Sequence, residues 1–475
     1  MQQAGLDGFI VPRADEHLSE YGRYTLQLAA QTDSALFERC HIIEQPPPDW
    51  LKAAAPGERI GYDPWLVSAD SLKRFTDAGL AMVAVSANPV DAAWSDRPPA
   101  PAAPAVPHPL HLAGVPSAEK RDAVAAALRD KGEDAAVITD PASLAWLLNL
   151  RGGDVDYTPF ALGFVLMHAD GRAALFMDPA KLDGAAREWL GNAVALQPPD
   201  ALPAALSALA GRKVRVDPAG SAAWFGQTLR ATGATVVDGP DPCALPKACK
   251  NPVEQAGARA AHARDAVAVC RFLHWLDGAP ATTEVAAANQ LLRFRAEAAE
   301  FRGESFPAIS GAGEHGAIIH YRVSEATDRA LAPNEVYLID SGAQYLDGTT
   351  DITRTVWTGP DVPPQQLRER FTRVLQGHIA LATAVFPQGL TGAHLDGFAR
   401  RALWQAGLDY DHGTGHGVGC YLSVHEGPVS ISRATKPVAI AAGMVLSNEP
   451  GFYLAGQYGI RLENLLLVQP ASLPN

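Results

Sequence analysis

The stretch that decides the fold of this chain is residues 336–355, VYLIDSGAQYLDGTTDITRT. It begins with four residues that favour a β-strand, and Asp340 follows directly after them. The dipeptide Asp347-Gly348 is the strongest short signal for a hairpin turn, and the returning strand carries Asp351. The stretch therefore predicts a β-hairpin with a carboxylate on each of its two strands.

The spacing of the two carboxylates constrains this hairpin. A two-residue turn at Asp347-Gly348 would place Asp340 and Asp351 on one face, four residues out of register, which is about 13 Å at ~3.3 Å per residue. That separation is too large for two ligands of one ion. Because buried carboxylates need partners, we expect a bulge or a longer loop at Ser341-Gly342-Ala343 to bring the two together. By itself the hairpin is compatible with a metal site and with a solvated turn.

Later segments supply further candidate ligands. Residues 411–419 are rich in glycine, which lets the backbone approach a ligand closely, and they contain His412 and His416. Glu449 ends one apolar strand, and Glu463 interrupts the middle of another. Carboxylate oxygens with a single imidazole nitrogen suit hard divalent ions, Mn(II) more readily than a metal that prefers thiolates. The sequence therefore favours a site for two divalent ions.

These segments resemble the motifs of Xaa-Pro aminopeptidases (aminopeptidase P), in the pita-bread family of dinuclear metallopeptidases that includes prolidase and methionine aminopeptidase. The matching motifs are DSGAQYLDGTTDITRT, HGTGHGVG, VHEGP, NEPGFY and GIRLEN, in the family's order. The similarity covers almost the whole chain and is closest to the long, three-domain, cytosolic-type enzymes. The resemblance implies an α/β architecture in which two accessory α/β domains precede a C-terminal pita-bread catalytic domain.

The resemblance also implies a dinuclear metal centre with five ligands. The ligands would be Asp340, Asp351, His416, Glu449 and Glu463. Asp351 and Glu463 would bridge two divalent ions. Mn(II) is the preferred identity of these ions, with Zn(II) or Co(II) as alternatives. A hydroxide between the ions would attack the carbonyl that precedes proline. Glu449 would accept the proton of that water and pass it to the leaving nitrogen.

Four further residues are candidates for contact with the substrate. His320 and His425 would flank it and stabilise the tetrahedral intermediate. Arg461 would orient the substrate, although it could instead neutralise Glu463. His412 could have a catalytic or orienting role, or it could simply form a hydrogen bond in a tight turn. The predicted reaction is release of the first residue from peptides with proline at position two.

Two other functions share these motifs. A prolidase would use the same metal ligands but would act on Xaa-Pro dipeptides. Some pita-bread domains have lost their metals and bind peptides or histones, but all five ligand residues are present here. Methionine aminopeptidase is disfavoured by the two domains that precede the catalytic one.

Length and composition suggest three domains, since 475 residues is about three times ~150. We expect an N-terminal α/β domain over residues 1–96, a Pro/Ala linker over 97–109, a middle α/β domain over 110–240 and the pita-bread domain over 241–475. Asp140 and Asn251 each precede a proline, which predicts a helix with Asp or Asn as its N-cap.

The N-terminal domain as numbered is expected to be incomplete. Relatives carry a few tens of residues between the motifs that resemble VPRADEH and GRYTLQ, whereas here Tyr21 is followed directly by Gly22. We therefore expect residues to be missing between Tyr21 and Gly22. Relatives also continue beyond the strand that begins at Leu465, so we expect further residues after Asn475.

Charge and cysteine content narrow the partners and the compartment. The formal net charge is −13, and two bound divalent cations would reduce it to −9 (−13 + 4). Such a charge argues against nucleic acid or an anionic membrane surface as a partner. The five cysteines show no C-x-x-C spacing, which favours free thiols in a reducing compartment. We expect a cytoplasmic protein, and the resemblance implies a homodimer.

Overall fold

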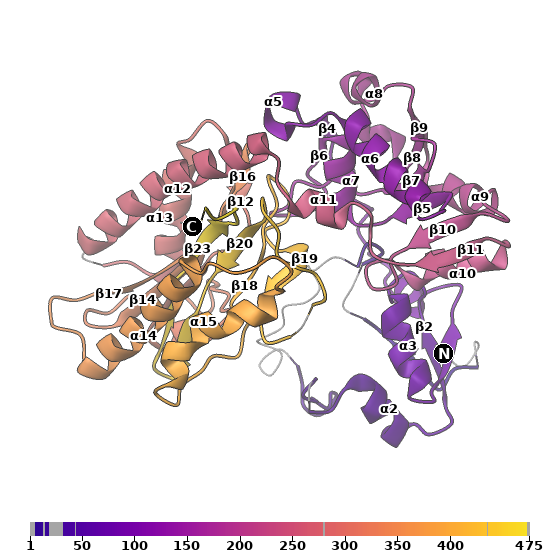
Figure 1. Ribbon diagram of the computed structural model, residues 1–475. Coiled ribbons are helices and arrows are strands. Elements are labelled where there is room, and N and C mark those ends of the chain that lie inside the picture. Colours follow the sequence, from indigo (N-terminus) through magenta and orange to yellow (C-terminus); the bar gives the residue numbers. More distant parts are fainter. Residues whose placement is uncertain are drawn as a thin grey trace. The chain divides into compact units, whose positions relative to one another are not determined.

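The computed structural model describes residues 5–12, 15–18, 32–42, 44–278, 281–434 and 436–472, and it has a mixed α/β fold as predicted. The chain divides into two compact units (Figure 1). Unit 1 consists of Met1–Pro107, Ser117–Asp154 and Phe160–Cys243, and unit 2 consists of His108–Pro116, Val155–Pro159 and Ala244–Asn475. The expected break between Tyr21 and Gly22 lies outside the described residues, and the three-domain division stays a prediction. Across the described ranges, none of the helices has the length and apolar character needed to cross a membrane.

The described residues of unit 1 form two larger sheets and a short two-stranded ladder. The parallel three-stranded sheet consists of β1 (Gly8–Ile10), β2 (Arg59–Tyr62) and β3 (Ala81–Ala84). The six-stranded sheet has the order β11-β10-β5-β7-β8-β9 and consists of β5 (Ala135–Ile138), β7 (Phe164–His168), β8 (Ala173–Phe176), β9 (Val194–Gln197), β10 (Lys213–Val216) and β11 (Thr235–Asp238). The ladder pairs β4 (Val106–Pro107) with β6 (Leu150–Arg151).

The helices of unit 1 are short and surround these sheets. They are α2 (Pro47–Ala54), α3 (Ala69–Asp77), α4 (Pro89–Ala93), α6 (Ser117–Asp130), α7 (Pro141–Leu148), α8 (Gly184–Leu190), α9 (Leu202–Ser207) and α10 (Ala223–Ala231), with the 3-10 turns η3 (Pro179–Lys181) and η4 (Pro199–Ala201). The expected helix start at Asp140 is confirmed, because its carboxylate accepts hydrogen bonds from the backbone N–H groups of Ala142 and Ser143.

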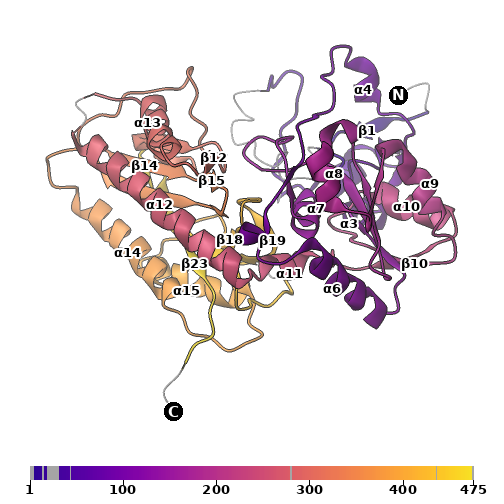
Figure 2. The same ribbon diagram turned by 90° about the horizontal axis from the view of Figure 1, so that it is seen from above.

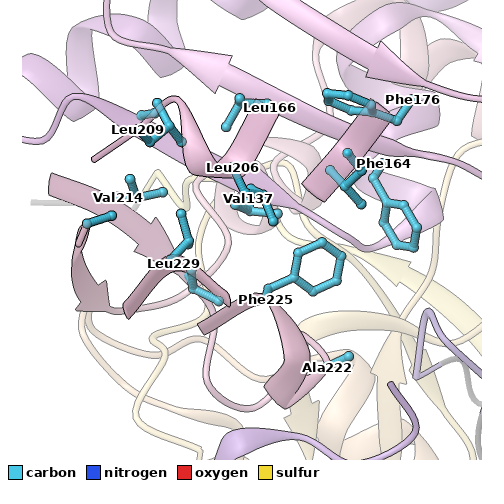
Figure 3. Packing of buried hydrophobic residues seen from close by; sticks show 14 residues of the cluster. Val137, Phe164, Leu166, Phe176, Leu206, Leu209, Val214, Ala222, Phe225 and Leu229 are labelled. Carbon is cyan, nitrogen blue, oxygen red and sulfur yellow. The ribbon is translucent and has the colours of Figure 1, made fainter. Parts of the chain in front are cut away.

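The core of unit 1 lies between the six-stranded sheet and the helices α9 and α10 (Figure 3). Val214 and Val216 alternate along β10, so that both side chains reach the same face of the sheet. Phe225 of α10 meets the ring of Phe164 edge-on, with 5.1 Å between the ring centroids. These large rings bury enough apolar surface to hold helix and sheet together.

Where the structure describes unit 2, its strands form four small sheets. Its strands are β12 (Phe301–Glu304), β13 (Ile309–Ala312), β14 (Val336–Ser341), β15 (Ala343–Tyr345), β16 (Gly348–Thr349), β17 (Ile352–Trp357), β18 (Gly415–Gly417), β19 (Glu426–Ile431), β20 (Val445–Asn448), β21 (Gly451–Leu454), β22 (Tyr458–Arg461) and β23 (Asn464–Leu467). The strand orders are β12-β15-β16, β13-β14-β17, β19-β18-β20-β23 and β21-β22.

Two pairs of helices enclose the strands of unit 2 (Figures 1 and 2). The helices are α5 (Leu110–Ala113), α11 (Ala244–Ala248), α12 (Pro252–Gly278), α13 (Glu284–Ala296), α14 (Gln365–Ala382) and α15 (Gly392–Trp404), with the 3-10 turn η5 (Gly313–Ala317). Helices α12 and α13 pack on β13 and β14, whereas α14 and α15 pack on the strands near the C-terminus. The expected start of α12 is confirmed: Asn251 accepts from the N–H of Glu254, and the Glu254 carboxylate accepts from the N–H of Asn251.

The hairpin of residues 336–355 forms, but its predicted turn is wrong. Tyr345 pairs with Gly348, so the turn residues are Leu346 and Asp347. Gly348 packs against helix α12, where a Cβ atom on it would lie 3.0 Å from that of Ala261. This glycine therefore serves a close approach rather than a turn conformation. Arg264 of α12 fixes Asp347 through a bidentate pair at 3.0 and 3.1 Å.

The expected bulge or longer loop is also wrong. Asp340 pairs with Thr353, and Tyr345 still pairs with Gly348, so the register does not change along the hairpin. The two strands separate at Gly342 without a shift and pass from one sheet to the next. Moving the turn back by one residue puts Asp340 and Asp351 two residues out of register instead of four. No insertion is needed to bring them together.

A buried ion pair holds the point where the strands separate. Arg295 of α13 forms a bidentate pair with Asp265 of α12 at 2.8 and 2.9 Å, and both side chains are almost fully buried. The guanidinium also lies 3.4 Å from the carbonyl oxygens of Ser341 and Gly342. Tyr345 donates its hydroxyl hydrogen to Asp265 at 2.9 Å. Helices α12 and α13 thus fix the backbone directly after Asp340.

Candidate metal centre

Asp340 offers one free carboxylate oxygen to the centre. It lies in β14 and is buried. Its Oδ2 accepts a hydrogen bond from Arg461 at 2.7 Å, whereas its Oδ1, also buried, has no hydrogen-bond partner within the described part of the chain. A buried carboxylate oxygen without a partner is unfavourable, and a cation would satisfy it.

His416 points one nitrogen at two carboxylates. Its Nδ1 lies 2.9 Å from the carbonyl oxygen of Gly417 and donates to it, which leaves the lone pair on Nε2. Nε2 lies 3.5 Å from Asp351 Oδ2 and 3.4 Å from Glu449 Oε1. Burial, followed by the charge of His425, lowers the pKa of His416 to about 3, so the ring is neutral. A lone pair between two carboxylates is the donor arrangement that a divalent cation requires.

Glu463 completes the cluster. It is fully buried and lies between β22 and β23, strands of different sheets, rather than inside one strand as expected. Ligand atoms of Asp351, His416 and Glu463 lie within 4.8 Å of one another. Two ligands that are each about 2–2.5 Å from one ion can be up to about 4–5 Å apart, so this spacing fits a shared ion.

Burial, and next the neighbouring carboxyl groups, raise the pKa values of the acidic residues in the cluster. Burial raises the pKa of Asp351 well above its ordinary value, and Asp340 and Glu449 raise it further. Burial followed by Asp351 does the same to the pKa of Glu463. The pKa of Glu449 rises to about 7, mainly through burial and partly opposed by Arg461. Divalent cations would replace the protons that these groups retain, so the donor set fits the two ions expected from the sequence.

A chain of hydrogen bonds leads from Asp340 to His412. Arg461 donates to Asp340, and also to the hydroxyl oxygen of Tyr453 at 2.6 Å. The Tyr453 hydroxyl lies 2.9 Å from Nε2 of His412, whose Nδ1 faces the carbonyl oxygen of Gly413 at 2.8 Å. Burial, followed by the charge of Arg461, lowers the pKa of His412 to about 3, so Nε2 accepts from Tyr453. His412 thus forms the turn contact and also supports Arg461, which pairs with Asp340 rather than Glu463.

The structure brings the two other predicted histidines to the same place. The ring of His425 lies 4.4 Å from that of His416 and is nearly perpendicular to it. His320 is exposed to solvent and follows η5. Partial loss of hydration, and next the positive charge of Arg461, lowers the pKa of His320 to about 4. A neutral ring at this position can accept or donate a hydrogen bond.

Sequence reasoning missed three residues of the site. Thr353 donates to Glu463 at 2.6 Å, and Ser447 donates to Glu449 at 3.1 Å while accepting from the N–H of His416. Each lies two residues from an acidic ligand, and that spacing in a strand places both side chains on one face. Tyr453 gives no such signal, because its role depends on how β21 pairs with β22.

Comparison with known proteins identifies the family of the chain. Residues 96–254 match the Creatinase/Prolidase N-terminal domain, and residues 256–470 match the Metallopeptidase family M24. A protein of Coccidioides posadasii (strain RMSCC 757 / Silveira), named "Probable Xaa-Pro aminopeptidase P", is 38% identical over 489 residues, which cover 98% of this chain and 80% of that protein. The chain belongs to the aminopeptidase P family.

Two further members of the family agree with this assignment. Aminopeptidase P2 of Arabidopsis thaliana is 36% identical over 551 residues, covering 99% of this chain and 77% of that protein. The crystal structure of X-prolyl aminopeptidase from Caenorhabditis elegans, a cytosolic enzyme with a di-nuclear active site, superposes with a TM-score of 0.88 at 34% identity. The superposition covers 96% of this chain and 82% of the C. elegans chain. The predicted order, an N-terminal α/β region followed by a pita-bread unit, is confirmed.

Proposed function

We propose that this chain is a metal-dependent aminopeptidase that hydrolyses the bond between an N-terminal residue and a penultimate proline. The observation that carries the proposal is the convergence of Asp351, His416 and Glu463 within 4.8 Å, beside a buried Asp340 oxygen that has no partner in the described structure. The relatives named Xaa-Pro aminopeptidase P, and the di-nuclear C. elegans enzyme, support it. Family membership favours this activity over that of a prolidase.

The five ligand residues would hold two divalent cations, with Asp351 and Glu463 shared between them. When bound, the ions would lower the pKa of a water molecule and polarise the scissile carbonyl. The carboxylate-rich donor set favours Mn(II), with Zn(II) or Co(II) as alternatives. Asp340 would also help to anchor the free α-amine of the substrate.

Glu449 is positioned to move the proton. It lies at the end of β20, and Ser447 fixes its Oε1 through a hydrogen bond at 3.1 Å. Its carboxylate would accept a proton from the attacking water and donate it to the leaving proline nitrogen. That nitrogen has to be protonated, because an amine is a far better leaving group than its anion.

His320, His425 and Arg461 would surround the substrate. The two rings would stabilise charge on the carbonyl oxygen as the tetrahedral intermediate forms. Arg461 would orient the peptide while holding Asp340, and His412 would orient Arg461 through Tyr453.

A bond to proline demands a specialised site. The proline nitrogen carries no hydrogen, and its ring fixes φ near −65°. Aminopeptidases that bind the N–H of the second residue therefore reject proline. We expect release of the first residue from Xaa-Pro-Yaa peptides, and much slower cleavage of Xaa-Ala-Yaa.

The test is a comparison of kcat/KM on three matched substrates after loading with Mn(II): Xaa-Pro-Yaa, Xaa-Ala-Yaa and Xaa-Pro. Comparable rates on the first two would refute proline specificity. Cleavage of Xaa-Pro alone would identify a prolidase. Binding of peptide without turnover, at any metal concentration, would instead indicate a metal-free binding module.

We also propose that the protein acts in the cytoplasm as a homodimer, with peptides and neither nucleic acid nor membranes as its partners. The cytosolic C. elegans enzyme and the net charge of −13 support the compartment and the partners. Light scattering coupled to gel filtration tests the dimer, since a monomer mass at micromolar concentration would contradict it.

A further inference from the structure

Glu284 is a fully buried carboxylate that binds one distant segment. It is the first residue of α13 and follows the N-cap Thr283. Its Oε1 accepts from the N–H of Ala312 at 2.7 Å, and both oxygens lie 2.9 Å from Nδ1 of His315. Its Oε2 accepts from the hydroxyl of Tyr321 at 3.2 Å. All three partners belong to residues 312–321.

These bonds are needed because burial of a carboxylate is unfavourable. No lysine or arginine pairs with Glu284 among the contacts of the described chain. The positive end of the α13 dipole offsets part of the loss of hydration. The three hydrogen-bond donors of residues 312–321 offset the remaining loss of hydration. This segment and the Glu284 carboxylate therefore stabilise one another.

Tyr321 connects this cluster to His320, the preceding residue. Its side chain is buried and stacks on His315 with 4.4 Å between the ring centroids. Its single hydroxyl hydrogen is shared between Glu284 and the carbonyl oxygen of Thr327, which lies 3.3 Å away. Burial raises the pKa of Tyr321 to about 12, so the hydroxyl remains a donor near neutral pH. With Tyr321 fixed inside, His320 is held outside and exposed.

The other side of the segment touches the strand that carries Arg461. A Cβ atom on Gly459 of β22 would lie 1.7 Å from the carbonyl oxygen of Gly316. The two backbones are therefore in direct contact, and Arg461 lies at the end of the same strand. Any movement of residues 312–321 would change where His320 lies relative to Arg461.

We propose that Glu284, His315 and Tyr321 form a positioning cluster that fixes His320 against the substrate. The inference rests on the proposed aminopeptidase function, within which His320 contacts the peptide. The three residues touch no substrate themselves and act through the backbone of residues 312–321.

The decisive experiment is a double-mutant cycle of Tyr321→Phe and His320→Ala. Tyr321→Phe removes a single hydroxyl, and we expect kcat/KM on Xaa-Pro-Yaa to fall roughly tenfold while two metals per chain are retained. In the His320→Ala background the same change should alter kcat/KM by less than about twofold. An equal loss in both backgrounds would overturn the proposal.

Tyr337→Phe is the matched control. Tyr337 is fully buried in β14, and its hydroxyl pairs with Ser310 at 2.7 Å rather than with the Glu284 carboxylate. Both phenylalanine variants should lose similar thermal stability, but only Tyr321→Phe should show coupling to His320. His315→Ala should behave like Tyr321→Phe, and His315→Asn, which restores a donor, should recover most of the activity.

Hydrogen exchange tests the cluster independently of activity. The amides of residues 312–321 should exchange faster in Tyr321→Phe and Glu284→Gln than in the wild type and in Tyr337→Phe. Unchanged exchange in this segment would overturn the inference even if the enzyme cleaves proline peptides. An inactive wild type with the expected exchange pattern would reject the proposed function and leave the cluster supported.

Discussion

At the scale of single residues, the guanidinium of Arg461 connects three parts of the site. It donates to Asp340, to Tyr453 and, at 3.3 Å, to the hydroxyl of Thr353, which itself binds Glu463. Arginine can do this because its donors form a rigid, planar fork. One side chain therefore sets the orientation of Asp340 and, through Thr353, supports Glu463.

Arg461→Lys is expected to lower kcat/KM by roughly 10- to 100-fold, because a single ammonium cannot reach both Asp340 and Tyr453 and a charged hydrogen bond is lost. Two metals per chain should remain, since the ligands are unchanged. Tyr453→Phe removes only the central hydroxyl and should cause a smaller loss. Steady-state kinetics with elemental analysis checks both, and loss of metal in the lysine variant would contradict the assigned role.

Glu449→Gln is expected to keep the fold and much of the metal binding while losing turnover by about 10²-fold or more, the effect of removing a general base. Replacement of either residue proposed to bridge the two ions, Asp351→Asn or Glu463→Gln, should instead reduce metal content, and by more than Asp340→Asn does. Titration with Mn(II) followed by elemental analysis distinguishes the two outcomes. Near-normal turnover of the Glu449→Gln variant would show that Glu449 does not transfer the proton.

At the scale of elements, helices α12 and α13 determine the shape of the hairpin. Helix α12 fixes the turn through Arg264, which pairs with Asp347. Helix α13 contributes Arg295, which pairs with Asp265 and also contacts the carbonyl oxygen of Gly342, where the two strands separate. The strands of this hairpin were predictable because apolar β-formers and acidic residues are local signals. The turn was not, because Gly348 is required by contact with Ala261, 87 residues earlier in the chain (348 − 261).

The candidate site also combines residues with a local sequence signal and residues that depend on tertiary contacts. The five candidate ligand residues, His412 and His425 come from quoted motifs that are each contiguous, so they could be named from the sequence. Tyr453 and the Glu284 cluster could not, because their partners are set by pairing of strands and by packing of α13. Residues that hold a site in place are specified by tertiary contacts, which one sequence does not reveal.

Arg295→Met is expected to destabilise the protein by about 3–5 kcal/mol, because it leaves the Asp265 carboxylate buried without a counter-charge. The double variant Arg295→Met with Asp265→Leu should recover part of that loss. Arg271 and Glu297 provide a control, since they pair across the same two helices but are exposed, and Arg271→Met should change stability little. Denaturant unfolding measures all three variants, and equal effects of the two methionine variants would contradict the argument.

At the scale of the whole molecule, metal binding and stability are linked through protons. Burial in the fold raises the pKa of Glu449 to about 7 and raises the pKa values of Asp351 and Glu463 well above their ordinary values. A carboxyl with a raised pKa in the folded state holds more protons there than in the unfolded chain. Its contribution to stability therefore falls as pH rises from its ordinary pKa to the raised one.

Bound cations would neutralise the repulsion between these carboxylates. The increase in Tm on loading with Mn(II) should therefore be larger at pH 8 than at pH 5.5, where protons compete with the ions for the same oxygens. Differential scanning calorimetry of chelated and loaded protein at both pH values measures this. Loading at pH 8 should give two ions per chain, and excess chelator should abolish activity. A pH-independent shift in Tm would argue against these carboxyls as the ligands.

The path of the chain between the two units constrains how this protein can evolve. The chain crosses from one unit to the other five times, at residues 107/108, 116/117, 154/155, 159/160 and 243/244. The short insertions are integral to unit 2: Gln344, in the hairpin strand β15, donates to the carbonyl oxygen of Tyr157, and Asn251 donates to that of Ala113. A single recombination event near residue 243 would exchange the N-terminal part of the gene but remove both acceptors from unit 2. The two units are therefore expected to be inherited together rather than shuffled as separate modules.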